Sequence, residues 1–274
     1  MKIAITGGSG FIGQAAQEYA KACGHSVLSF DRADGNDVLG SLDMLADFGA
    51  ETVIHLAGML GTHELFDTPG LAIDVNVRGT LRVLQWCAAN NAGYVGISMP
   101  PAFESVYTAT KLAADRLATA WHREYGVPVS RVVAFNAFGP GQKHGPGHPQ
   151  KIIPTFATHA WAGKPIPIWG DGEQTVDLIH VDQIGRILIQ ATQYGNGETF
   201  DAGTGAAYTV NQIAAHILDM TQSGAGVEHL PMRRGEVPTT IRASGKGWDM
   251  LGWEPRFSFG DLSATVDSYK GVAP

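Results

Sequence analysis

The chain has few cysteines, no run of like charges and no long apolar segment. Its two cysteines, Cys23 and Cys87, lie in stretches with a helical pattern and resemble neither a disulfide framework nor a metal cluster. No stretch approaches the roughly 18 apolar residues of a membrane span. The apolar run after Met1 and Lys2 is too short for a signal peptide. We therefore expect a soluble, cytoplasmic protein without a membrane partner.

Basic residues are not in excess either. Lysine and arginine number 19 against 26 acidic residues, so the formal net charge is −7, which argues against a nucleic-acid partner. The 14 prolines, without a G-X-Y period or an internal repeat, exclude a collagen-like or low-complexity chain. Hydrophobic residues make up 44% of the chain, which is enough to bury a core.

Glycine, by contrast, is abundant. The chain has 35 glycines in 274 residues, nearly twice the usual share of about 7%. In a chain of normal core composition, this excess indicates many tight turns and places where the backbone approaches a ligand. The length fits one large domain or one and a half ordinary domains.

In the first half of the chain, short apolar runs alternate with segments of helical period, which predicts βα units and a parallel sheet. The expected strands are 2–6, 25–30, 52–56, 94–98 and 129–135, and the expected helices are 11–23, 42–48, 72–89 and 105–125. A loop rich in glycine and proline follows at 139–149. Beyond it we expect helices at 153–162, 183–192, 210–221, 245–251 and 260–269, a strand at 199–201 and a hairpin around 170–172.

This order predicts an α/β fold with a Rossmann-type doubly wound parallel sheet and a smaller mixed α/β portion. We assign residues 1–138 to an NAD-binding Rossmann domain, to which residues 173–204 return. Residues 139–172 and 205–274 would form the substrate-binding portion.

Three glycines, Gly7, Gly10 and Gly13, follow the first expected strand and open the first helix. The first permits a tight turn, the second lets a pyrophosphate approach the backbone, and the third lets helix and strand pack closely. Such a spacing alone also fits an ordinary turn. Here the strand, glycines, helix, second strand and a terminal acid occur in the expected order, which favours dinucleotide binding.

The terminal acid is Asp31, 18 residues after Gly13. Its carboxylate can accept both ribose hydroxyls and would repel a 2′-phosphate. NAD is therefore favoured over NADP, although Arg32 weakens this preference. Asp37 and Val38 follow where a loop contacting adenine would lie, but a plain turn explains Asp37 about equally well.

Tyr107 and Lys111 begin the helix expected at 105–125. Residues four apart share a helix face, so the phenol and the ammonium can point into one cleft. The ammonium and a positive nicotinamide ring would lower the pKa of Tyr107 and make it a plausible base for a sugar or alcohol hydroxyl. The alternative is a core tyrosine beside a surface lysine, but the preceding dinucleotide turn favours the catalytic interpretation.

With these motifs the sequence resembles the extended short-chain dehydrogenase/reductases, in particular the NAD-dependent nucleotide-sugar epimerases and dehydratases. The resemblance covers nearly the whole chain. It rests on TGGSGFIG (6–13), HLAG (55–58), DVNVRGTLRVL (74–84), YTATKLAADRL (107–117), FNAFGPGQ (135–142), WGDGEQTVDLIHVDQ (169–183), FDAGTG (200–205), RRGEV (233–237) and LGWEP (251–255).

The resemblance implies NAD as the cofactor and a tyrosinate that removes the proton of a sugar hydroxyl, commonly at C4, while hydride passes to NAD⁺. Lys111 would hold the nicotinamide ribose. Asn136 and Arg233 or Arg234 would hold the nucleotide diphosphate, since the arginine fork binds phosphate bidentately; a solvated basic pair is the alternative for the two arginines. The further cofactor-binding residues that it implies are Phe11, Ile12, Leu56, Ala57, Gly58 and Asn76.

The chain departs from the family pattern at Met99, which stands where the family has a catalytic serine or threonine and cannot donate a hydrogen bond. The connection to Tyr107 is also shorter than usual. Ser98 is the first candidate to supply the hydroxyl and Ser105 the second, although serine at a strand end often serves as a cap. Thr62 and Met99 are further candidates for contact with the substrate.

Two other departures bear on the reaction and the substrate. Family 4,6-dehydratases carry an Asp-Glu pair where Pro100 and Pro101 stand here, and no acid follows until Glu104, which argues against dehydration. Val176 stands where the family often has an arginine that contacts the diphosphate. This puts the affinity for a nucleotide sugar, or its identity, in question.

No metal site is expected. The histidines at 55, 63 and 180 lie on separate elements without ligand spacing, and those at 144 and 148 lie in the glycine-proline loop. Solvated or supporting roles are favoured for all five.

The leading interpretation is an NAD-dependent nucleotide-sugar epimerase acting at C4, with Tyr107 as base, Lys111 as its electrostatic partner and Ser98 as hydroxyl donor. One alternative is a nucleotide-sugar reductase or dehydrogenase with exchangeable NAD(H). Another is a catalytically silent dinucleotide-binding sensor or scaffold, against which the Tyr107/Lys111 pair counts. A homodimer through helices 72–89 and 105–125 is expected from the family, although their apolar faces fit burial within one chain as well.

Overall fold

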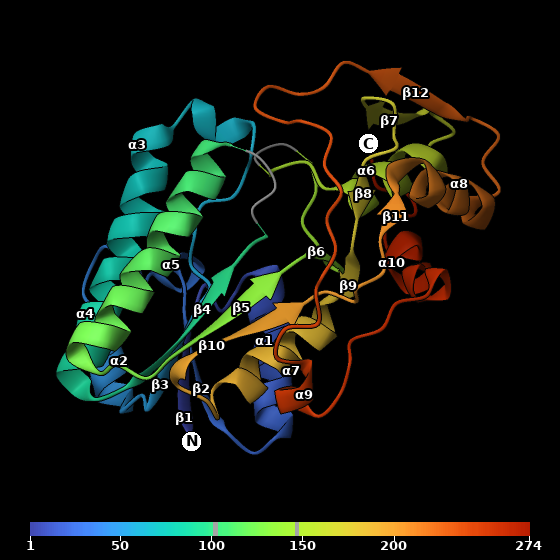
Figure 1. The fold of residues 1–274 in the computed structure, drawn as a ribbon. Helices are drawn as coiled ribbons and strands as arrows, with labels where there is room; N and C mark the ends of the chain where they lie inside the picture. The colour runs from blue at the N-terminus through green and yellow to red at the C-terminus, as the bar shows by residue number, and fades with distance from the viewer. Residues whose placement is uncertain (101–103, 146–147) are drawn as a thin grey trace.

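The computed structural model describes residues 1–100, 104–145 and 148–274, and a parallel sheet of six strands forms its centre (Figure 1). The strand order is β10-β5-β4-β3-β1-β2, and every neighbouring pair is parallel. The strands are β1 (Lys2–Thr6), β2 (Ser26–Phe30), β3 (Thr52–His55), β4 (Gly93–Ser98), β5 (Val129–Ala134) and β10 (Asn196–Ala202). This is the predicted Rossmann-type α/β fold, with the strand order reversing on either side of β1.

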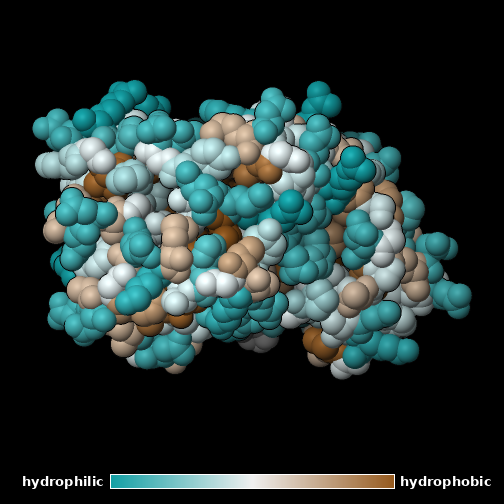
Figure 2. Space-filling view, turned by 90° about the horizontal axis from the view of Figure 1, so that it is seen from below, coloured by the Kyte–Doolittle hydropathy of each residue, from teal (hydrophilic) through white to brown (hydrophobic). Residues whose placement is uncertain are grey.

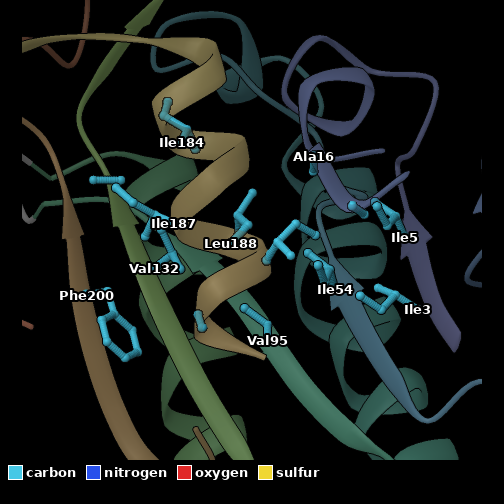
Figure 3. Packing of buried hydrophobic residues seen from close by; sticks show 14 of the residues in the cluster. Ile3, Ile5, Ala16, Ile54, Val95, Val132, Ile184, Ile187, Leu188 and Phe200 are labelled. Atoms are coloured by element: carbon cyan, nitrogen blue, oxygen red, sulfur yellow. The ribbon is translucent and has the colours of Figure 1, made fainter. Parts of the chain in front are cut away.

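Helices cover both faces of the sheet. On one face, α1 (Phe11–Ala22) and α7 (Val181–Ala191) bury side chains such as Ala16, Ile184 and Leu188 against Ile5 and Val95 of the sheet (Figure 3). On the other face, α2 (Asp43–Phe48), α4 (Thr80–Asn90) and α5 (Val106–Tyr125) form a second core. Within β1, Ile3 and Ile5 belong to the first core and Ala4 to the second, as the two-residue period of a strand requires.

The helix expected at 72–89 differs in detail from the prediction. It begins earlier, with α3 (Pro69–Ala72), because Pro69 suits the first turn of a helix. It continues as a π-helical segment, Ile73–Gly79, before α4. Within the π-helical segment, the Asn76 carbonyl accepts a hydrogen bond from Thr80 Oγ1 at 2.7 Å. Helical structure therefore covers the whole expected range, but it starts three residues earlier and contains a π-helical segment that the sequence pattern did not predict.

A third core lies beyond β5. It includes Phe138, Phe156, Ile166 and Ile213 and joins α6 (Ile152–Trp161), α8 (Val210–Thr221) and α10 (Ser263–Asp267) to three strand pairs. These pairs are β6 (Asn136–Phe138) with β9 (Leu178–His180), β7 (Ile166–Trp169) with β12 (Val227–Leu230), and β8 (Thr175–Val176) with β11 (Tyr208–Thr209).

The hairpin expected around 170–172 is absent from this described region. Gly170 and Gly172 turn the chain with φ of 86° and 79°, but β7 and β8 each pair with a strand from later in the chain. Local turn residues predicted the turn correctly and the strand pairing wrongly, because the partners β11 and β12 are distant in sequence.

The C-terminal helices are also shorter than expected. Helix α9 spans only Trp248–Leu251, since Gly245 and Gly247 have φ of 85° and 79°, outside the helical range. The segment expected as a helix at 260–269 is a 3₁₀ turn, Phe259–Leu262, followed by α10. Although Leu251 lies in the part assigned to the substrate portion, it packs in the first core beside the sheet. The proposed domain boundaries remain a prediction.

Of the helices in the described residues, none combines the length and apolar character needed to cross a membrane. Figure 2 shows one face of the molecule, on which apolar residues are scattered among hydrophilic ones.

Candidate active site

A cavity of about 700 Å³ opens where the parallel strands end and extends toward the third core. Its lining includes Gly7 and Asp31 from the first βαβ unit, Tyr107 and Lys111 from α5, and Arg233 from the C-terminal part of the chain. The motifs singled out in the sequence therefore meet at the carboxyl end of the sheet, which is where ligands bind in open α/β folds.

The glycine turn is shaped so that only glycine fits at two of its positions. A Cβ on Gly13 would lie 2.3 Å from the Gly7 carbonyl oxygen. Gly7 has φ of 71°, and its Cβ would lie 2.7 Å from the Ala57 nitrogen. Gly10 caps α1 and lines the cavity with Phe11 and Ile12. The turn thus presents backbone and a helix N-terminus to the cavity, which suits the pyrophosphate of NAD.

Asp31 lies at the edge of the same cavity. Its two carboxylate oxygens accept hydrogen bonds from Ser9 N at 3.2 Å and Ala33 N at 2.9 Å. These bonds hold the carboxylate in place and leave lone pairs for ribose hydroxyls. Arg32 is paired with Asp37 at 3.6 Å, and both side chains are largely exposed. Val38 is buried, with Gly79 packed against it, and lines the cavity with Leu56, Ala57 and Gly58.

Asn76 is among the cofactor-binding residues that the family resemblance implied. Its side chain is 2% exposed and does not line the cavity in the described structure. It accepts a hydrogen bond from Met59 N at 2.7 Å and donates to Met59 O at 3.1 Å and to Thr110 Oγ1 at 3.0 Å. In the described structure Asn76 therefore connects the loop after β3 to α5, and its contact with the cofactor stays a prediction.

Helix α5 begins at Val106, one residue before Tyr107. Ser105 caps it, accepting a hydrogen bond from Thr108 N at 3.1 Å, as serine commonly does. Ser105 is buried and does not line the cavity in the described structure. It is therefore not placed to supply a hydroxyl to a substrate. Its cap instead fixes where α5 starts and brings Tyr107 and Lys111 to the cavity on the same face.

Burial governs the acid-base properties of this pair. It raises the pKa of Tyr107 to about 12 and lowers the pKa of Lys111 to about 8, while the Asp115 carboxylate acts on Lys111 in the opposite direction. Burial thus acts on Tyr107 in the direction opposite to that expected of the Lys111 ammonium together with a positive nicotinamide ring. It does so because desolvation penalises the charged phenolate.

Ser98 and Met99 both line the cavity at the end of β4. The Ser98 hydroxyl donates a short hydrogen bond to Asp115 Oδ2 of α5. Because serine has a single hydroxyl proton, this bond directs the proton to Asp115 and leaves lone pairs for the cavity. In this arrangement Ser98 can accept a hydrogen bond from a substrate hydroxyl, whereas donating one would require breaking its bond to Asp115. The sequence did not single out Asp115, although it lies four positions after Lys111.

On the opposite wall, Arg233 forms a two-pronged pair with Glu236, at 2.9 Å from Nε and 2.6 Å from Nη2. Its guanidinium lies 4.7 Å from the centre of the Trp169 ring. Thr62 donates to Glu236 Oε1 at 2.6 Å and so connects the loop after β3 to this segment. Glu236 and Trp169 are in the motifs RRGEV and WGDGEQ. Nothing else in the sequence predicted that they contact Arg233.

Arg234 does not line the cavity in the described structure. It lies 4.8 Å from the centre of the Phe66 ring and 4.0 Å from the Asp67 carboxylate. Of the two arginines, only Arg233 is therefore placed to reach a ligand. Asn136 and Val176 do line the cavity.

Several buried polar atoms at the cavity wall have no hydrogen-bond partner within the described structure. They are Gln142 Oε1, Thr155 Oγ1, Gln174 Oε1 and Thr175 Oγ1. Buried polar groups without partners are costly. Their concentration on the wall beyond the sheet fits a polar ligand in that half of the cavity.

The described residues contain no group of three or more histidine, cysteine or acidic side chains that could hold a metal. His63 and His180 lie at helix starts, and His180 accepts from Asp182 N. His144 lies 3.5 Å from Thr158 Oγ1. His55 is buried and contacts the hydroxyls of Thr6 and Thr80, which fits the supporting role among the two alternatives expected for it.

Comparison with known proteins identifies similar enzymes. The chain is 29% identical to the UDP-glucuronate 4-epimerase of Thermodesulfobacterium geofontis, over 96% of this chain and 94% of that protein. It is 28% identical to a dTDP-glucose 4,6-dehydratase of Streptomyces niveus, over 98% and 93%. The crystal structure of Thermotoga maritima UDP-glucose 4-epimerase with UDP-glucose superposes with a TM-score of 0.90 at 25% identity, over 99% of both chains.

The family model described as "NAD dependent epimerase/dehydratase family" matches residues 3–203, which include the glycine turn, Asp31, Tyr107 and Lys111. NAD is the cofactor of this family, and the turn and the ribose-binding acid described above fit it. The chain therefore belongs to the NAD-dependent epimerase/dehydratase family.

Proposed function

We propose that the protein is an NAD-dependent nucleotide-sugar 4-epimerase. The observation that carries the proposal is the single cavity in which Tyr107 and Lys111 lie between the dinucleotide turn and the wall that bears Arg233. One ligand can thereby reach the base while a second occupies the turn. The relatives include UDP-sugar 4-epimerases at comparable coverage.

In this proposal each side chain has a defined task. The glycine turn and Asp31 would hold NAD⁺, which would supply a hydride acceptor and donor for the sugar carbon. Tyr107 removes the proton of the 4-hydroxyl and gives it back, so the sugar passes through a 4-keto form that can turn before reduction. Lys111, at the same cavity wall, stabilises the developing phenolate. Arg233 offers a planar fork to the diphosphate.

Dehydration is less well supported, although dTDP-glucose 4,6-dehydratases are among the relatives. That reaction moves protons at C5 and C6, and the family dehydratases use an acidic pair beside the catalytic threonine. Here Pro100 stands at the first position of that pair and lines the cavity beside Met99, without an acidic group. Pro101, the second position of the pair, lies outside the described residues.

The test is conversion of UDP-, GDP- and dTDP-sugars by the purified protein, followed by NMR without added cofactor. We expect a 4-epimer to form. Tyr107→Phe should lower the rate by about 10³-fold or more, because the hydroxyl that moves the proton is gone. Phe keeps the ring, so NAD retention should be unchanged.

Three outcomes would contradict the proposal. Turnover only with stoichiometric NAD(H) consumption would support a reductase or dehydrogenase. NAD binding without conversion of any sugar would support the sensor or scaffold. Full epimerase activity in the Tyr107→Phe protein would rule out the assigned base.

A homodimer through the α4 and α5 side of the molecule is part of the same proposal. Leu71, Ile73 and Leu112 are apolar and 45%, 53% and 38% exposed. They lie on α3, the π-helical segment and α5, which contact one another. Exposed apolar residues on elements that contact one another suit an interface between two copies.

A further inference from the structure

Asp115 is a partly buried acid that none of the motif assignments uses. It lies on α5, one turn beyond Lys111 and two turns beyond Tyr107, so all three are near one face of the helix. The Ser98 hydroxyl of β4 donates to Asp115 Oδ2, while Ser98 itself lines the main cavity. A hydrogen bond therefore connects α5 to the strand end beside the proposed base.

Asp115 also lines a second cavity of about 270 Å³, together with Arg116, Arg131 and Thr199. Arg131 is held there by bonds to Thr119 Oγ1 at 2.5 Å and Gly197 O at 2.9 Å. Asp115 thus connects the lining of the second cavity to Ser98 in the lining of the main cavity. Its carboxylate accepts the Ser98 hydrogen bond and lies near cationic side chains.

The charged and titratable groups around Asp115 come from three elements. Lys111 and Arg116 of α5, with Arg131 of β5, attract its negative charge, and Tyr94 of β4 interacts with it as well. Burial raises the pKa of Asp115, while the Ser98 bond and the three cations oppose that rise. Around Lys111, the interacting groups are Asp115 and the neutral His55 of β3, with Tyr107 on the same helix face.

We propose that Asp115 is a positioning residue of the active site, which fixes the Ser98 hydroxyl at the cavity wall and is the electrostatic partner that keeps Lys111 protonated beside Tyr107. The inference rests on the proposed function for its kinetic consequences. Two properties follow from one carboxylate. The Ser98 hydroxyl donates its hydrogen bond to Asp115 and presents its lone pairs to the sugar. Lys111 keeps its positive charge although it is buried.

The kinetic test compares Asp115→Asn with the native enzyme on UDP-glucuronic acid and UDP-glucose. Asparagine keeps the shape and removes the charge. We expect kcat to fall about 10-fold or more with KM changed less than about threefold, since neither substrate binding wall is altered. In the Ser98→Ala background, Asp115→Asn should lower kcat by clearly less than in the native background, because part of its effect passes through Ser98.

Glu124→Gln is the matched control, because Glu124 is an exposed acid near the end of the same helix. It should leave kcat and KM unchanged. The inference would be overturned if the effects of Ser98→Ala and Asp115→Asn on kcat were additive, or if Asp115→Asn had the native kcat. Neither result would affect the support that Tyr107→Phe gives to an epimerase.

A second readout does not require turnover. The proteins are labelled with ¹³C-lysine, and the NMR signal of Lys111 is identified by its absence from the Lys111→Met spectrum. In the NAD-loaded native protein and in Ser98→Ala, this signal should titrate at a similar pH. In Asp115→Asn it should titrate at lower pH, since the opposing carboxylate is gone. An unchanged Lys111 titration would overturn the electrostatic part. If no sugar is converted at all, the proposed function fails and this titration still decides the role of Asp115.

Discussion

His55 is held between two threonine hydroxyls in an arrangement that only the neutral imidazole satisfies well. Thr80 Oγ1 donates its proton to Asn76 O, so the contact at 3.1 Å from His55 Nε2 requires a proton on that nitrogen. Nδ1 then accepts from Thr6 Oγ1 at 2.7 Å. Burial, together with the charge of Lys111, lowers the pKa of His55 to about 3.

This side chain predicts acid sensitivity. Below pH 6.5 the unfolded chain protonates His55, whereas the folded chain does so only near pH 3. The unfolded state therefore binds more protons in this window, and the free energy of unfolding falls as pH decreases from 6.5 toward 3. The His55 contribution to this loss is about 2 kcal/mol by pH 5.

Urea unfolding at pH 7.5 and pH 5 measures this contribution when the native protein is compared with His55→Gln. The glutamine variant should be less stable at pH 7.5 but lose less stability on acidification. Equal losses in the two proteins would show that other groups account for the acid sensitivity.

Tyr107 and Ser98 show how far residue spacing predicts chemistry. The four-residue interval correctly placed Tyr107 and Lys111 at one cavity, because helical geometry is local. The direction of the Tyr107 pKa shift could not be predicted, since burial depends on the packing of distant segments. For the same reason the bond from Ser98 to Asp115 was not foreseen, as it joins a strand to a helix.

The contact between α1 and α7 depends on a single glycine. A Cβ on Gly185 of α7 would lie 2.8 Å from the backbone C and O of Ala15 in α1, so the two helices approach at backbone distance. Side chains of both helices, including Ala16, Ile184 and Leu188, belong to the core on one face of the sheet (Figure 3). Glycine is required at position 185 because the backbone of α1 occupies the space that a side chain would need.

Gly185→Ala should therefore lower the free energy of unfolding by about 1–3 kcal/mol, the usual cost of overpacking a rigid interior. Gly70→Ala is the control, because Gly70 lies in α3 with no atom within 4 Å of a Cβ placed there. It should be neutral or slightly stabilising, as alanine favours a helix. Chemical denaturation measures both, and equal stability of the two variants would contradict the argument.

The elements of the first half could be predicted closely from their periodicity, because each βα unit has its own alternation of buried strand and amphipathic helix. The errors fell where distant contacts decide. They are the π-helical segment around Asn76, the false hairpin at 170–172, and the shortened helices near the C-terminus. In each case, the local pattern was compatible with more than one tertiary arrangement.

The proposed dimer can be tested by sedimentation equilibrium at micromolar protein. We expect a mass of twice the 29.1 kDa chain. Leu112→Glu should shift the protein toward the monomer, because a buried carboxylate at an apolar interface is strongly unfavourable.

Val227→Glu serves as the matched control, since Val227 is 42% exposed on β12, outside the α3–α5 region. It should leave the mass unchanged. A native mass of one chain, or a dimer that persists in Leu112→Glu, would contradict an interface at this face.

The amino-acid sequence alone was sufficient for the α/β class, the dinucleotide turn with Asp31, and the Tyr107/Lys111 pair, because glycine conformation and helical spacing are local properties. Tertiary structure was needed to identify Arg233 rather than Arg234 as the cavity arginine, to show Ser105 as a cap, and to reveal Asp115 behind Ser98. These roles depend on which side chains from distant segments meet, and on what burial does to their charges.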